Sequence, residues 1–297
     1  MNILNQFDYH APKTKNEALK LVEDLGEKAK ILAGGTDLII MLKEKMIKPQ
    51  AIIDISSLDE LKGIKCEKGK GAEIGAGTTI SAIEFSKELS EKYSALTYAA
   101  GELGGHQVRC AATIGGNCCH SSPAAETPPS LCAFGAKVVL GSLKGEREMA
   151  VEDFIVGNRK NALQPGEMVT KFILPEPAPK SACRYGYIGL RNAMEIDAVN
   201  MAVNITLEDD GATVKNVKLV MGSVSPRPLV SEAIPALLAG KALSAELIEK
   251  AGEAVQGEAK PISDVRASAA YRRDVVGALA RRLIKEAYEA AKEAKKA

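Results

Sequence analysis

The stretch "TIGGNCCHSS", residues 113–122, combines a glycine pair with two cysteines, a histidine and two serines. A second glycine pair lies far earlier in the chain, in "AGGTDL", residues 33–38. Each pair follows an apolar segment of β type. Because glycine has no Cβ, successive backbone N–H groups at such a turn can form a concave anion-binding nest. The two segments therefore fit either one extended dinucleotide ligand or two ordinary tight turns.

The thiols and the imidazole of residues 113–122 lack the spacing of a metal site. Structural zinc sites usually use C-x2–4-C or H-x3–5-H pairs, and an iron–sulfur cluster needs four thiolates in a local run. Cys118 and Cys119 are adjacent, and the chain holds only three histidines. We expect no metal centre in this chain. The six cysteines are expected to be free thiols, with Cys118, Cys119 and His120 serving as framework residues or as neighbours of a ligand.

Length and charge narrow the classes of protein that the chain can represent. With 297 residues it exceeds one compact core of common size, so two or three subdomains are expected. The net charge of +1 provides no attraction for nucleic acid. No segment reaches the roughly 18 consecutive apolar residues of a membrane helix, and no secretory signal is apparent. The sequence predicts a cytoplasmic protein with no nucleic-acid or membrane partner.

Helix and strand signals alternate in the first sixty residues. Thr14 and Glu17 have the spacing of a capping box, apolar residues follow at helical spacing, and Gly26 can end the helix. Short apolar strands are expected at residues 31–33 and within "QAIIDIS", residues 50–56. This alternation predicts an α/β or α+β start.

Further along, "AEIGAGTTI", residues 72–80, predicts a strand followed by a helix capped by Ser81 and Glu84. The proline-rich "FILPEPAPK", residues 172–180, predicts a domain boundary, because proline cannot extend a hydrogen-bond ladder. The last third alternates strands and helices and ends in a long helix that begins near Tyr271.

Gly75 and Gly77 begin like a dinucleotide fingerprint that the sequence does not complete. The third glycine position of G-x-G-x-x-G holds Ile80, so the Rossmann pattern fails. The two glycines fit a strand-end turn as well as they fit a cofactor contact.

Taken together, the motifs resemble the FAD-binding subunit of molybdenum hydroxylases of the xanthine dehydrogenase and carbon monoxide dehydrogenase type. The resemblance rests on the order and spacing of several segments: "ILAGGTDLI", "IGAGTTI", "GGHQVRCAATIGGNCCHSS", "NALQPGEMV", "RNAMEIDAV" and "GSVSPRPL". It implies an α+β protein with the FAD-binding fold of the vanillyl-alcohol-oxidase and p-cresol-methylhydroxylase type. Two α/β subdomains, residues 1–60 and 61–176, would be followed by a C-terminal α+β domain at residues 177–297.

The resemblance also implies which residues bind the cofactor. One loop would wrap the FAD pyrophosphate, a second would lie on the phosphate side, and single positions would face the cofactor's hydroxyls or the flavin ring. Glu126 stands where the family usually has Asp, Tyr187 where many members have Lys, and "MEID", residues 194–197, where the family has "MDIA". The implied cofactor-binding residues are Ile31, Leu32, Ala33, Gly34, Gly35, Thr36, Asp37, Leu38, Thr113, Ile114, Gly115, Gly116, Asn117, Ser122, Glu126, Met168 and Tyr187.

The implied function is electron transfer through non-covalently bound FAD. A large partner subunit would carry the molybdenum cofactor, and a small partner would carry [2Fe–2S] clusters that deliver electrons to this flavin. NAD(P)+ is the expected acceptor, in a xanthine dehydrogenase-like dimer of heterotrimers, and no catalytic side chain is expected in this chain. The alternatives are a self-contained FAD-dependent reductase of the same fold and a flavin-free scaffold subunit.

Overall fold

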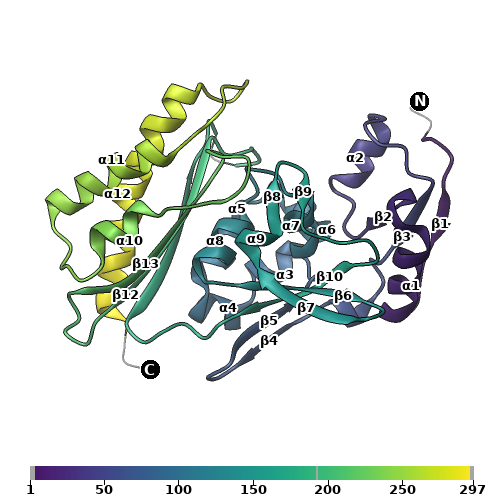
Figure 1. Cartoon of the computed structure of the whole chain (residues 1–297), viewed down its shortest axis with the longest axis horizontal. Helices are drawn as coiled ribbons and strands as arrows, with labels where there is room; N and C mark the ends of the chain where they lie inside the picture. Colours follow the sequence, from purple (N-terminus) through teal and green to yellow (C-terminus); the bar gives the residue numbers. More distant parts are fainter. Residues whose placement is uncertain (1–3, 192, 295–297) are drawn as a thin grey trace.

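The computed structural model describes residues 4–191 and 193–294 and arranges them as three units along one long axis (Figure 1). A small three-stranded sheet with its helices lies at one end, a five-stranded sheet with short helices lies in the middle, and a four-stranded sheet backed by long helices lies at the other end. Each unit has its own cluster of buried apolar side chains.

The N-terminal unit is a parallel sheet in the order β1-β3-β2. Thr14 Oγ1 accepts a hydrogen bond from Glu17 N at 3.2 Å, and Gly26 ends the first helix with a φ of +50°. Both features confirm the expected start and stop of that helix. The elements are β1 (Asp8–His10), α1 (Lys15–Leu25), η1 (Gly26–Lys28), β2 (Ala29–Leu32), α2 (Leu38–Lys43) and β3 (Ala51–Asp54).

The central unit is an antiparallel sheet in the order β4-β5-β10-β6-β7, with one short 3-10 helix, seven short α-helices and a two-stranded hairpin around it. Its strands are β4 (Ile64–Glu67), β5 (Gly71–Gly75), β6 (Lys137–Ser142), β7 (Gly145–Ala150), β8 (Ile155–Gly157), β9 (Lys160–Asn161) and β10 (Met168–Leu174). Its helices are η2 (Asp59–Leu61), α3 (Ile80–Glu84), α4 (Lys87–Lys92), α5 (Ser94–Glu102), α6 (His106–Ala111), α7 (Ile114–His120), α8 (Thr127–Ala133) and α9 (Val151–Phe154).

The helix after β5 begins earlier than the sequence predicted. Thr79, not Ser81, is its N-cap and accepts a hydrogen bond from Ala82 N at 3.2 Å. Glu84 does not close a capping box, because its carboxylate forms an ion pair with Arg109 at 2.7 Å. Thr79 also forms a β-bridge with Thr113, and this tertiary contact holds it in the extended conformation of an N-cap.

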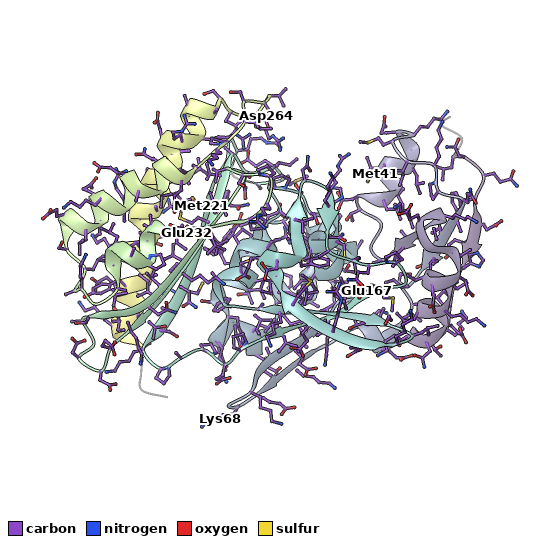
Figure 2. The ribbon with its side chains drawn as sticks, in the orientation of Figure 1. Met41, Lys68, Glu167, Met221, Glu232 and Asp264 are labelled. Atoms are coloured by element: carbon purple, nitrogen blue, oxygen red, sulfur yellow. The ribbon has the colours of Figure 1, made fainter. Side chains whose placement is uncertain are left out.

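The C-terminal unit is an antiparallel sheet in the order β11-β12-β13-β14 with helices on its outer face (Figure 1). Its inner face packs against α5 and α8 of the central unit, and Figure 2 shows Met221 within this sheet. The expected apolar face of the last helix is confirmed, since Val276, Leu279 and Leu283 are buried. The elements are β11 (Ser181–Ile188), β12 (Val199–Leu207), β13 (Val214–Gly222), β14 (Leu229–Val230), α10 (Ala233–Leu238), α11 (Ala245–Glu258) and α12 (Ala269–Glu293).

The proline-rich connection lies between the central sheet and the C-terminal sheet. Strand β10 ends at Leu174 and β11 begins at Ser181, so the prolines of residues 175–179 form no part of either ladder. All six cysteines are unpaired. Among the helices of the described residues, none combines the length and the apolar character that a bilayer crossing requires.

Candidate functional site

The two glycine segments, far apart in sequence, lie against each other. A Cβ on Gly34 would overlap Ala111 O and would lie 2.9 Å from Ala112 Cα, directly before the N-cap Thr113. At the far end of the contact, His120 Nε2 lies 3.7 Å from Asp37 Oδ1. Only a residue without a side chain permits this approach at position 34.

The loop between β2 and α2 offers unpaired backbone donors. Within the described residues, none of the N–H groups from Gly34 to Leu38 donates to a protein acceptor, and the first bond beyond them runs from Ile39 N to Gly35 O at 3.0 Å. Gly35 adopts a φ of +74°, a conformation that favours glycine. Four of the five residues are half-buried and Asp37 is exposed, so these N–H groups can be satisfied by water or by an anionic ligand.

The second glycine segment differs from the expected turn, because it opens helix α7. Thr113 is the N-cap, and its Oγ1 accepts from Gly116 N at 3.0 Å. Ile114 N donates to Thr78 O at 3.1 Å, and Gly115 N donates to Ala76 O at 2.9 Å. These N–H groups are therefore already satisfied by protein. A Cβ on Gly115 would lie 2.7 Å from Ala76 O, so this glycine serves a close backbone approach.

A buried carboxyl lies on the loop that follows α7. Glu126 is 9% exposed, and its Oε2 accepts from Asn117 Nδ2 at 3.4 Å. Burial, with the negative charge of Asp197 as a second cause, raises the pKa of Glu126 to about 8. Ser122 lies earlier in the same loop, where its Oγ accepts from Ala124 N at 3.3 Å. The carboxyl and the hydroxyl thus lie close in sequence to the α7 segment that meets Gly34.

A second buried carboxyl enters from the C-terminal unit. Asp197 is 3% exposed, and its Oδ2 accepts from Asn200 Nδ2 at 3.1 Å and from the Tyr185 hydroxyl at 3.4 Å. Burial raises the pKa of Asp197 to about 7, and the carboxylates of Glu195 and Glu102 add to the rise. Two buried acids with raised pKa values near one loop are typical of functional sites.

The two positions expected beside the flavin ring have different surroundings. Tyr187 is half-buried on β11, where a hydrogen bond to Glu102 and burial raise the pKa of its phenol. Met168 begins β10 at 1% exposure and packs in the N-terminal cluster with Ile31 and Ala33. Met168 therefore supports the strand that leads to the Gly34 loop.

The third glycine motif has a packing role. A Cβ on Gly75 would overlap Leu61 O, and Gly77 N donates to Leu61 O at 2.7 Å. Cys118 is fully buried, and burial raises the pKa of its thiol, so it packs as a small apolar residue. Among the residues with described positions, no group of three or more His, Cys, Asp or Glu side chains is placed to hold a metal ion.

The site includes residues that the sequence analysis did not single out. Ala111 and Ala112 provide the surface on which Gly34 rests, and Tyr185 and Asn200 hold the Asp197 carboxyl. The sequence could have indicated Asn200, because it is an amide within the apolar stretch "AVNMAVNITL", and a buried amide needs hydrogen-bond partners. The alanines carry no such signal.

The described residues suit a phosphate-bearing cofactor with hydroxyl groups. The Gly34–Leu38 amides can donate to phosphate oxygens, and Glu126 with Ser122 can bind hydroxyls. The half-buried ring of Tyr187 can lie beside an aromatic ring. These features fit FAD.

Family models match nearly the whole chain in two parts. Residues 5–177 match the FAD binding domain in molybdopterin dehydrogenase, and residues 187–287 match the CO dehydrogenase flavoprotein C-terminal domain. The carbon monoxide dehydrogenase medium chain of Afipia carboxidovorans is 31% identical over 98% of this chain and 99% of that protein. The xanthine dehydrogenase FAD-binding subunit of Escherichia coli O157:H7 is 29% identical over 95% of this chain and 96% of that protein.

A solved structure gives the same result for the fold. This chain superposes with a TM-score of 0.92 and 30% identity on a chain of the carbon monoxide dehydrogenase from Hydrogenophaga pseudoflava. That enzyme was solved in a form that lacks the Mo-pyranopterin moiety of the molybdenum cofactor. The match covers 97% of this chain and 99% of that chain. The expected α+β architecture, an FAD-binding fold followed by a C-terminal domain, is thereby confirmed. The chain belongs to the FAD-binding subunits of the molybdopterin dehydrogenases and is an oxidoreductase subunit of that family.

Proposed function

We propose that this chain binds FAD non-covalently and passes electrons from the [2Fe–2S] clusters of a small partner subunit to NAD(P)+. A large partner subunit carries the molybdenum cofactor, in a xanthine dehydrogenase-like complex built as a dimer of heterotrimers in the cytoplasm. The observation that carries the proposal is the row of unpaired N–H groups from Gly34 to Leu38, held against Ala111 and Ala112.

Each part of the site has a role in this proposal. The Gly34–Leu38 amides and the Thr36 hydroxyl hold the diphosphate, and α7 closes the loop from the other side. Ser122 and Glu126 accept hydrogen bonds from ribityl or adenosine hydroxyls. Bound FAD supplies the change from one-electron delivery to two-electron transfer, and the protein supplies placement and electrostatics. No side chain of this chain is assigned as a catalytic acid or base.

The substrate of the complex is assigned to another subunit. The curated relatives include a nicotinate dehydrogenase, a glyceraldehyde dehydrogenase and a caffeine dehydrogenase, at closely similar identity to this chain. This subunit type therefore accompanies chemically different substrates. We propose a purine as the first substrate to test. The proposed domain limits are residues 1–60, 61–176 and 177–297.

Flavin content tests the proposal directly. The protein, purified alone or with its partners, should carry extractable FAD, and NADH should bleach the flavin absorbance near neutral pH. Replacing Gly35 by Val should abolish flavin retention, because a β-branched residue is strained at a φ of +74° and would displace the side chains of Ile39 and Leu32 beside the loop. Gly257→Ala, on the exposed face of α11, is the matched control. Normal FAD content in Gly35→Val would contradict the assignment.

The subunits that co-purify with the chain separate the alternatives. Mass spectrometry should identify a molybdopterin subunit and an iron–sulfur subunit. A flavin-loaded protein that purifies alone and reduces a substrate with NADPH would favour the self-contained reductase. A colourless protein that cannot be reconstituted with FAD would favour the scaffold subunit.

A further inference from the structure

Asn200 joins the C-terminal sheet to the loop that carries Ser122 and Glu126. It is fully buried as the second residue of β12, and its Nδ2 donates to Ala124 O at 3.4 Å as well as to Asp197 Oδ2 at 3.1 Å. A neighbouring bond runs from Ser223 N to Pro123 O at 2.7 Å. The sheet of a different unit thus holds this loop in addition to the bond from Asn117 of α7 to Glu126.

The side chain of Asn200 can adopt only one useful orientation. Gly222 lies opposite Asn200 in the β12–β13 register, and a Cβ on Gly222 would overlap Asn200 Oδ1. Oδ1 is buried and has no hydrogen-bond partner in the described chain. With Oδ1 confined against Gly222, the amide nitrogen is left facing both the loop carbonyl and the Asp197 carboxyl.

Acidic and phenolic groups surround Asp197. Glu102 lies on α5, Glu195 on the loop before Asp197, and Glu126 at the start of α8. The negative charges of Glu102 and Glu195 raise the pKa of Asp197, and the charge of Asp197 raises the pKa of Glu126. Tyr185 on β11 donates a hydrogen bond to Asp197. The buried cation Arg272 on α12 donates to Ala198 O at 2.8 Å and forms an ion pair with Asp264 at 2.7 Å. No Lys or Arg side chain among residues 4–191 and 193–294 forms an ion pair with Asp197, so Asn200 and Tyr185 are the groups that stabilise its ionised form.

We infer that Asp197 and Asn200 are positioning residues for the cofactor, and that they hold residues 121–126 more firmly when Asp197 is ionised. The inference rests on the proposed function, since it assigns Ser122 and Glu126 to the FAD site. A carboxylate accepts the Asn200 N–H and the Tyr185 O–H more strongly than a neutral acid does, because charge-assisted hydrogen bonds are about twice as strong. Loss of the proton from Asp197 therefore fixes the amide that holds Ala124 O.

A matched pair of asparagine variants tests the positioning role. Asn204 lies on the same strand, and its Nδ2 donates to Ala133 O of α8 at 3.1 Å, away from the loop. Asn200→Ala should weaken FAD binding by about tenfold, the equivalent of one lost hydrogen bond of ordinary strength. Asn204→Ala should lower the urea midpoint to a similar extent and leave the FAD dissociation constant nearly unchanged. Equal loss of FAD affinity in both variants would overturn the inference.

The role of Asp197 ionisation is tested by measuring the FAD dissociation constant over a range of pH. The sample is the full chain with its co-purifying subunits, from which the flavin has been removed. In the natural protein, affinity should rise several-fold as the pH passes upward through 7. Asp197→Asn, which keeps a neutral acceptor, should bind FAD at high pH as the natural protein does at low pH. In the Asn200→Ala background, the substitution at Asp197 should no longer change the affinity, because Asp197 acts through Asn200.

The outcomes separate the two proposals. If the natural protein does not bind FAD, the proposed function fails. If it binds FAD and Asp197→Asn keeps the natural pH dependence, or if that substitution still acts when Asn200 is absent, the positioning role fails while the function stands.

Discussion

Gly34 is the residue on which the approach of the two glycine segments depends. Its missing side chain lets the β2–α2 loop rest on Ala111 and Ala112, and this contact places the free N–H groups of residues 34–38 next to α7. Glu126 and Asp197 illustrate a different effect, because their acidity depends on burial and on their neighbours rather than on residue type.

Replacing Gly34 by Ala should separate the two segments. The added Cβ would overlap the Ala111 carbonyl, which is backbone and cannot rotate away. We expect a loss of about 1–3 kcal/mol in the free energy of unfolding, as for other overpacked sites, together with reduced FAD content. Gly257→Ala, in open space on a helix, should instead increase stability by about 0.5–1 kcal/mol. Urea denaturation followed by circular dichroism measures both; an unchanged midpoint for Gly34→Ala would refute the contact.

The buried acids should make the stability of the FAD-free protein fall with rising pH. The folded-state pKa values of Asp197, about 7, and Glu126, about 8, lie above the ordinary values of 3.8 and 4.5. The folded state therefore holds these protons more tightly than the unfolded state. Their contribution to stability is fully present below about pH 4 and is lost as the pH rises through 7 to 8, at up to about 1.4 kcal/mol per group and pH unit.

Asp197→Asn provides the check on this pH dependence. The variant lacks one of the two acids, so its urea midpoint should fall less between pH 5.5 and 8.5 than that of the natural protein. Identical slopes for the two proteins would show that Asp197 ionises as freely in the folded state as in the unfolded one.

At the scale of elements, helix α3 shows how a tertiary contact moves a boundary. Ser81 and Glu84 have the right spacing for a capping box, yet Thr79 is the N-cap because its bridge to Thr113 holds it extended. The same bridge aligns α3 with the start of α7, so one pair of threonines sets the starting points of two helices. Glu84 forms an ion pair with Arg109 instead, and both side chains are mostly buried.

Two alanine substitutions distinguish these caps. Thr79→Ala removes the acceptor for Ala82 N and should lower the free energy of unfolding by about 1 kcal/mol. Ser81→Ala, inside the first turn of the same helix, should have little effect. Thermal unfolding measures the stability of both variants. A larger loss of stability for Ser81→Ala than for Thr79→Ala would show that Ser81 is the N-cap.

For the whole molecule, the central and C-terminal units share one buried interface. Tyr185, Ala202 and Val220 of the C-terminal sheet belong to the same apolar cluster as the helices of the central unit. An ion pair between Lys218 and Glu152 at 2.5 Å and the bond from Asn204 to Ala133 O cross the same interface. The contact around Asn200 is thus one part of an extended interface between the two units.

This interface should survive a break in the connecting chain. A specific protease site inserted between Pro177 and Ala178, within the proline-rich connection, should be cleaved without separating the two parts. The fragments should co-elute in gel filtration and keep their FAD, because buried apolar contacts and not the connection hold them together. The same protease site inserted at Lys68, in the turn of the β4–β5 hairpin within the central unit, is the control for the effect of an insertion and a cut as such (Figure 2). Fragments that elute apart would show two independent domains.

The sequence by itself determined the local elements and the family. The first helix follows from Thr14 and Gly26, the last from the apolar spacing of Val276, Leu279 and Leu283, and the resemblance from several ordered motifs. These signals are local, since capping and amphipathic periodicity depend on neighbours within a few positions. The glycine pairs themselves placed the two segments in one hypothesis, that of a shared dinucleotide ligand, beside the alternative of two ordinary turns.

Tertiary structure alone decided how those segments are used. It made Gly115 and Gly116 the first turn of a helix whose N–H groups are satisfied by Thr78, Ala76 and Thr113, and it left the donors of residues 34–38 free. It also brought Asp197 and Asn200 to the loop of Glu126 from a distant strand. Hydrogen-bond partners and burial arise from contacts between residues far apart in the chain, and no local pattern encodes them.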